Sequence, residues 1–183
     1  NRYDAQKLQR IITMTAVTLP CIKLEQHGRS FFLLSMPADL VVGMSYAAVR
    51  GRDNEQGAVQ RVLNTKRISN IKDFALAGGK FPNAIVMNWV VEGGLAFDED
   101  SSSISFERSV RLAQLIDGQH RVAGLSEAIQ VDDSLKNLQI PVAIYDNLTT
   151  KECADIFLSI NTEQKPVHRS LVFDLYAIAD EQI

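Results

Sequence analysis

Residues 117–121, with the sequence Asp-Gly-Gln-His-Arg, combine side chains that bind phosphate oxygens and transfer protons. They stand between an apolar stretch that ends at Ile116 and a stretch with helical spacing that begins at Val122. Where a strand passes into a helix, several backbone N–H groups point at one spot, and the helix dipole attracts anions there. Gly118 lets the backbone approach a ligand closely, and Arg121 carries a planar fork of donors that suits phosphate.

The side chains of this segment predict both binding and catalysis. His120 can donate a hydrogen bond or act as a general acid or base near neutral pH. Asp117 can hold His120 or Arg121 in place, or bind a metal ion beside a phosphate. Gly118, Gln119, His120 and Arg121 are therefore candidate phosphate-binding residues, and His120 and Asp117 are candidate catalytic residues. The residues alone leave a second interpretation open, an Asp-Gly turn that caps a helix and binds nothing.

Two further polar segments could complete such a site. Gln60 and Arg61 place an amide beside a guanidinium, which suits a phosphate or the edge of a base. Asn161, Gln164 and Lys165 follow an apolar helical pattern and form a predicted polar loop. Both segments also fit plain alternatives, a solvated pair ahead of a helix and an ordinary connection between helices.

The elements that position these residues predict a mixed α+β fold with interleaved strands and helices. The predicted strands cover residues 11–24, with an interruption at Pro20 left open, 31–34, 84–87 as a central strand, 104–106, 110–116 and 140–145. The predicted helices are one capped by Asn64 or Thr65, one with Val122, Leu125 and Ile129 on its apolar face, one opened by the capping box at 149–152, and one from Ser170. Residues 93–103 and 161–167 are predicted loops, and Trp89 is predicted to lie in the core.

The bulk properties limit the partners of the chain. Its 183 residues suit a single domain over 1–183, and its formal net charge of −3 restricts any DNA contact to a local patch. Cys21 and Cys153 form no metal-type pair and are predicted to be buried. Neither a signal peptide nor a membrane-spanning run is visible, which predicts a cytoplasmic protein without a membrane partner. The chain begins without Met and stops inside a predicted helix, so we expect it to be a fragment of a longer protein.

Four segments in order resemble the DGQHR-domain family of bacterial DNA-modification systems. Residues 117–121 carry the five letters that name the family, and Gln60-Arg61 resembles its upstream Gln-Arg pair. Residues 81–86 resemble the strand between the two, and residues 157–167 resemble its downstream Phe-x-x-Ile-Asn loop. The family includes DndB-type regulators of DNA phosphorothioation and proteins of 7-deazaguanine DNA-modification clusters.

The family is in turn similar to the ParB and sulfiredoxin superfamily, which implies a mixed sheet with flanking helices and a nucleoside triphosphate at the glycine-containing turn. Sulfiredoxins have Gly-Cys-His-Arg at this turn, and Gln119 replaces their cysteine, so sulfinic-acid repair does not fit. ParB-type proteins have Gly-Glu-Arg-Arg, which the chain matches at Gly118 and Arg121 only. The resemblance implies ATP or CTP as cofactor, with Mg²⁺ bridging its phosphates, and phosphate contacts from Gly118, His120 and Arg121.

Three functions remain after these observations. The first is a nucleotide-binding component of a DNA-modification or defence system, with slow nucleoside triphosphate hydrolysis and other DNA-modification proteins as partners. The second is a non-enzymatic DNA-binding transcriptional regulator of a modification operon, in which Arg50, Arg52, Lys66 and Arg67 would add phosphate contacts. The third is a nuclease, which ranks last because the sequence has no compact cluster of acids with metal-ligand spacing. For the same reason no dedicated metal site is predicted.

Overall fold

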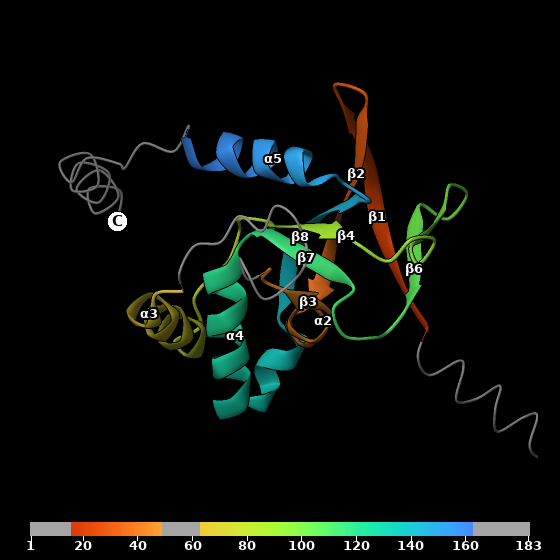
Figure 1. The fold of residues 1–183 in the computed structure, drawn as a ribbon. Helices are drawn as coiled ribbons and strands as arrows, with labels where there is room; N and C mark the ends of the chain where they lie inside the picture. Colours follow the sequence, from red (N-terminus) through yellow and green to blue (C-terminus); the bar gives the residue numbers. More distant parts are fainter. Residues whose placement is uncertain (1–15, 49–62, 163–183) are drawn as a thin grey trace, which may run out of the picture.

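The computed structural model describes residues 16–48 and 63–162. Within these ranges the chain forms four α-helices and an open, mixed sheet of eight strands (Figure 1). The mixed α+β fold predicted from the sequence is therefore confirmed. None of the helices in these ranges is long and apolar enough to cross a membrane.

The strands and helices of the described residues have the following bounds. The strands are β1 (Ala16–Gln26), β2 (Arg29–Pro37), β3 (Ser45–Tyr46), β4 (Ile85–Trp89), β5 (Ala96–Asp98), β6 (Ser103–Glu107), β7 (Ala113–Asp117) and β8 (Gln139–Asp146). The helices are α2 (Ala38–Met44), α3 (Thr65–Leu76), α4 (Gln119–Val131), the 3-10 helix η1 (Asp133–Asn137) and α5 (Thr150–Thr162).

The strand order is β3-β7-β4-β8-β2-β1-β6-β5. Strands β3 and β7 are parallel, as are β4 and β8, and the other neighbours are antiparallel. Strand β4 lies between β7 and β8, which confirms the predicted central strand. Helix α5 lies over one face of this part of the sheet, and α2, α3 and α4 lie on the opposite side (Figure 1).

Two of the apolar clusters formed by the described residues lie on the two faces of the sheet. The larger one packs α2 and α4 against the sheet and includes Trp89, which is 1% exposed as predicted. The smaller one lies beneath α5 and centres on Ile116, Leu148 and Cys153. Asn88 connects β4 to the segment before α5, because its side chain donates to the Leu148 carbonyl at 3.2 Å and accepts the Leu148 N–H at 2.8 Å. Helix α5 is thus tied to the strands beneath it at its N-terminal end.

Strand β1 continues across Pro20 and changes its partner there. Residues 16–20 pair with β6, and residues 21–26 pair with β2. Proline has no N–H for a ladder, so it fits the position where one set of hydrogen bonds gives way to the other. The interruption that the sequence left open does not occur.

Three sequence predictions about boundaries were wrong. Residues 93–103 are not a loop throughout, because they contain β5, which pairs with β6. The strand predicted at 110–116 begins only at Ala113, since Val110 is 72% exposed and Arg111 has a left-handed φ of 56°. Asn161 is not in a loop, because α5 continues through residue 162.

Candidate functional site

The turn between β7 and α4 requires glycine at position 118 for two reasons. Gly118 precedes the first helical residue with φ 100° and ψ 11°, a left-handed conformation that side chains rarely adopt. A Cβ atom there would also lie 3.1 Å from Cγ1 of Ile85 and 3.3 Å from Nη2 of Arg121. No side chain caps α4, so the N–H groups of its first turn are not satisfied by a local side-chain acceptor.

A β-bulge lies immediately before this turn. Val86 of β4 is opposite Asp117, whereas Met87 is opposite Leu115, so β7 has one extra residue in this step. Leu115 packs in the larger core, and Ile116 packs in the smaller cluster beneath α5. The extra residue interrupts the usual alternation, which explains how both Ile116 and Asp117 can line the same cavity.

Arg121 is held by partners from two segments. Its Nη2 donates to Asp117 Oδ2 and to the Ala84 carbonyl, both at 2.9 Å, and its Nη1 donates to the Asn83 carbonyl. The guanidinium therefore connects the turn to the segment that enters β4. An arginine has five N–H donors, and three of them are used by described residues. The sequence predicted that Asp117 holds either His120 or Arg121 in place, and the structure shows the contact with Arg121.

His120 connects α4 to α3. The backbone N–H of Asn64 donates to Nε2 of His120 at 3.0 Å, and the ring is buried at 9% exposure. Because Nε2 accepts a hydrogen bond, it carries no proton, and the neutral ring has its proton on Nδ1. Asn64 is also the cap of α3, as predicted, since its Oδ1 accepts the N–H of Arg67 at 3.1 Å. The first turns of both helices therefore meet at His120.

These elements enclose a cavity of about 430 Å³, here called the turn cavity. Its lining comes from the first turns of α3 and α4, the ends of β4 and β7, and the last turns of α5. The lining residues are Arg67, Asn83, Ala84, Val86, Ile116, Asp117, Gly118, Gln119, His120, Arg121, Phe157, Ile160 and Asn161. Two guanidinium groups and two helix N-termini thus surround one mainly polar space, an arrangement that favours anions.

Gln119 lines the turn cavity and carries a buried acceptor without a hydrogen bond to any described residue. The residue is 8% exposed, and its Oε1 is buried without a hydrogen-bond partner among the described residues. A buried amide without a partner costs free energy, so such groups commonly mark a position where a ligand or water completes the hydrogen bonds. The amide orientation follows from its surroundings, and the opposite orientation would present a donor instead.

The turn cavity brings together every predicted site residue that the structure describes. Asp117, Gly118, Gln119, His120 and Arg121 line it from one side. Asn161 lines it from α5, where its Nδ2 donates to the Phe157 carbonyl at 2.8 Å. The remaining candidates, Gln60, Arg61, Gln164 and Lys165, lie outside the described residues. No group of three or more His, Cys, Asp or Glu side chains that could hold a metal ion occurs within residues 16–48 and 63–162.

Sequence reasoning assigned Arg67 to a DNA-binding patch and did not place it at the turn. Arg67 comes from the first turn of α3, and its position follows from the contact between α3 and α4, which no local pattern predicts. The backbone carbonyls of Asn83 and Ala84 were also missed as site components, because any residue type supplies a carbonyl. The Phe-x-x-Ile-Asn spacing at 157–161 was the available signal for the α5 wall.

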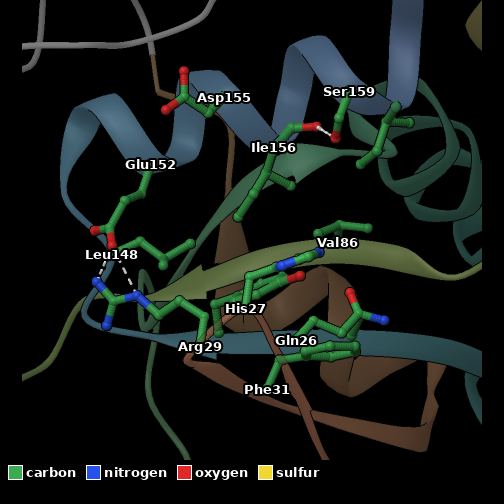
Figure 2. Close-up of a pocket in the computed structure, with 13 residues that line it drawn as sticks. Gln26, His27, Arg29, Phe31, Val86, Leu148, Glu152, Asp155, Ile156 and Ser159 are labelled. Carbon is green, nitrogen blue, oxygen red and sulfur yellow. Dashed lines mark hydrogen bonds and ion pairs between the residues drawn. The ribbon is translucent and has the colours of Figure 1, made fainter. Parts of the chain in front are cut away.

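A second cavity, of about 680 Å³ and here called the hairpin cavity, lies beneath α5 (Figure 2). Its lining residues are Gln26, His27, Arg29, Phe31, Val86, Ala143, Tyr145, Leu148, Glu152, Asp155, Ile156, Ser159 and Ile160. Figure 2 shows Glu152, Asp155, Ile156 and Ser159 on the α5 side and residues of the β1–β2 hairpin opposite them. The hairpin cavity is larger and more apolar than the turn cavity.

An ion pair joins the two walls of the hairpin cavity. Nε of Arg29 donates to Glu152 Oε1 at 2.8 Å, and Nη2 of Arg29 donates to the same oxygen (Figure 2). Glu152 Oε2 accepts from the N–H of Thr149 at 2.8 Å and from its hydroxyl at 2.7 Å, which confirms the predicted capping box. The Arg29 and Thr149 hydrogen bonds lower the pKa of Glu152 to about 2.

Comparison with known proteins gives one family match. A family model described as DndB, DNA-sulfur modification-associated, matches residues 19–181. The matched range includes every residue that lines either cavity. No curated protein matches the chain.

Proposed function

Since the chain belongs to the DndB family of DNA-sulfur modification-associated proteins, we propose that it is a nucleotide-binding component of a DNA-modification system and that its turn cavity holds the phosphates of a nucleoside triphosphate. The family provides the biological setting, DNA sulfur modification. The chemistry proposed for this chain rests on the turn cavity and its lining.

The observation that carries the proposal is the meeting of two helix N-termini and two arginines at one cavity. Arg67 and the first turn of α3 lie on one side, and Arg121 and the first turn of α4 lie on the other. The first backbone hydrogen bond of α4 runs from Val122 N–H to the Gly118 carbonyl at 2.9 Å. The N–H groups that precede Val122 are those that commonly bind phosphate at helix starts.

The charges of the site are compatible with an anion. Asp117 is the acid that lines the turn cavity, and its ion pair with Arg121 offsets its charge. Arg67 lines the same cavity and makes no ion pair with a described residue. In this proposal Arg121 stabilises the turn with three of its N–H donors and has two left for a phosphate. Arg67 attracts the phosphates through its positive charge.

The other members of the site have separate roles in the proposal. Mg²⁺ would bridge phosphate oxygens, as it does at sites where the protein supplies one or two carboxylates, and Asp117 has the chemistry to contribute one. Nε2 of His120 holds α3 and α4 together by accepting the Asn64 N–H. We therefore propose that His120 shapes the binding site and that its Nε2 takes no part in proton transfer.

Isothermal titration calorimetry with ATP and CTP, with and without Mg²⁺, tests the proposal on the full-length protein. Arg67→Ala should weaken binding about tenfold, because it removes a charge-assisted contact worth roughly 1.4 kcal/mol or more. Lys66→Ala is the matched control, since it removes the adjacent positive charge from a residue that does not line the turn cavity. Its affinity should stay within about twofold of wild type.

Two results would reject the proposal. The first is the absence of triphosphate binding by folded wild-type protein at millimolar concentration. The second is equal affinity for the wild type and Arg67→Ala. A DNA complex that weakens steeply with salt, found together with the first result, would support the DNA-binding regulator instead.

A further inference from the structure

The two cavities are neighbours along one side of α5. Val86 and Ile160 line both of them, so the same two side chains form the boundary between the turn cavity and the hairpin cavity. Ile156 lines the hairpin cavity and Asn161 lines the turn cavity. These residues are five positions apart, about 7.5 Å along the axis at 1.5 Å per residue. A single nucleotide can span that separation, because its base and its phosphates are joined through one ribose.

The hairpin cavity has the lining that a planar aromatic group requires. Phe31 of β2 and Tyr145 of β8 are opposite each other in the sheet and stack, with centroids 5.0 Å apart and rings inclined by 27°. Val86, Leu148 and Ile156 add apolar walls. Aromatic and aliphatic side chains that enclose a base contribute stacking and desolvation without regard to its identity. The turn cavity, by contrast, is mainly polar and carries two arginines.

The charges of the hairpin cavity disfavour phosphate compared with those of the turn cavity. The Arg29 guanidinium is paired with Glu152, so no unpaired arginine lines this cavity within the described residues. The turn cavity, in contrast, is lined by Arg67 and Arg121. A nucleotide therefore has a preferred direction, with its phosphates near Arg67 and Arg121 and its base in the hairpin cavity.

We infer that the hairpin cavity holds the base of the same nucleotide. The inference rests on the proposed function, because that function places the phosphates. Phe31 and Tyr145 contribute aromatic lining, and Val86, Leu148 and Ile156 contribute apolar lining against which a base can pack.

Calorimetry on the full-length protein separates this inference from the proposed function. Inorganic tripolyphosphate tests the turn cavity alone, and ATP and CTP test it together with a base. ATP should bind at least tenfold more tightly than tripolyphosphate.

A cavity-filling variant provides the second measurement. Ser159→Trp adds a large side chain from α5 into the hairpin cavity and should weaken ATP at least tenfold while tripolyphosphate affinity stays within twofold. Leu158→Trp is the matched control, because Leu158 is a neighbouring residue on the same helix, is 53% exposed and lines neither cavity. It should bind both ligands as wild type does.

The possible outcomes are distinct. If wild type binds tripolyphosphate and ATP equally, or if Ser159→Trp binds ATP normally, the base does not lie in the hairpin cavity and only the phosphate site survives. Loss of tripolyphosphate binding in Ser159→Trp overturns the inference as well, since the two cavities would not be separate subsites. If wild type binds neither ligand, the proposed function itself fails.

Discussion

The backbone N–H of Asn64 donates a hydrogen bond to Nε2 of His120 across 3.0 Å, and this bond joins the first turns of α3 and α4. The two residues are 56 positions apart in the chain. Because the turn cavity lies between these first turns, its shape depends on the imidazole as a spacer. His120 is therefore a structural element of the site, whatever further role it has with a ligand.

Replacing this imidazole should lower stability. His120→Ala leaves the Asn64 N–H without its acceptor and creates a cavity, so the free energy of unfolding should fall by about 1–3 kcal/mol. His120→Gln retains an acceptor at a similar distance from the backbone and should recover part of the loss. Urea unfolding followed by the fluorescence of Trp89, the single tryptophan and 1% exposed, measures both. Equal stability of the alanine variant and wild type would contradict the assigned spacer role.

A second prediction concerns Gly118. Gly118→Ala should destabilise the protein by about 2–3 kcal/mol, because a left-handed φ costs an L-residue about 1–2 kcal/mol and the new Cβ also contacts Ile85. Gly28→Ala is the matched control, since Gly28 has φ 75° with nothing within 4 Å of a new Cβ. It should show the backbone cost alone. Thermal unfolding compares the two, and an equal loss in both would mean that the contact with Ile85 adds nothing.

The sequence predicts the turn of the site because its determinants are local. An apolar strand, a glycine and an amphipathic helix occur within a dozen residues around Gly118, and each leaves a periodic or compositional signal. The partners of Arg121 at Asn83 and Ala84 leave no such signal, because they are backbone carbonyls 38 and 37 positions away. The contact of Arg67 with the turn cavity likewise depends on helix packing.

The errors in the fold have the same origin. Strand β5 has three residues, of which Ala96 and Asp98 are exposed, so neither length nor alternation distinguishes it from a loop. Residues 110–112 have apolar members typical of a strand, but Arg111 has a left-handed φ and the regular strand begins only at Ala113. The partner of each half of β1 also follows from tertiary packing, and at Pro20 the sequence raised only the question of an interruption.

A third prediction concerns pH and Glu152. Its pKa in the folded protein, about 2, lies below the ordinary value of 4.5, so the ionised carboxylate stabilises the fold above pH 4.5 and the contribution is lost as the pH falls toward 2. The group is partly exposed, so Glu152→Gln should cost only about 0.5–1 kcal/mol at pH 7. The difference between variant and wild type should shrink between pH 4.5 and 2 and in high salt.

Glu127→Gln serves as the control for this experiment. Glu127 is exposed on α4 and makes no ion pair with a described residue, so its replacement should leave stability unchanged within about 0.5 kcal/mol. Urea unfolding of the three proteins at several pH values provides the comparison. A Glu152→Gln deficit that is independent of pH would show that the charge of Glu152 contributes nothing.

The last prediction tests whether the spacing of α3 and α4 sets the site. A Cβ on Gly124 would lie 2.5 Å from Cγ2 and 2.7 Å from Cβ of Ile71, so the helices approach as closely as glycine allows. Gly124→Ala should cost about 1–3 kcal/mol through overpacking, although alanine is the better helix former by about 1 kcal/mol. Gly43→Ala is the control, because nothing lies within 4 Å of its Cβ and it should be neutral or stabilising.

A double-mutant cycle identifies the cause of that cost. Ile71→Ala removes part of the side chain that obstructs the new methyl group, so the double variant with Gly124→Ala should be less destabilised than the sum of the two single changes. Triphosphate affinity should fall in Gly124→Ala and recover partly in the double variant, because separating the helices also separates Arg67 from Arg121 across the turn cavity. Additive stabilities would mean that Gly124 and Ile71 do not interact. Unchanged affinity in the destabilised single variant would mean that the distance between the two helices does not control phosphate binding.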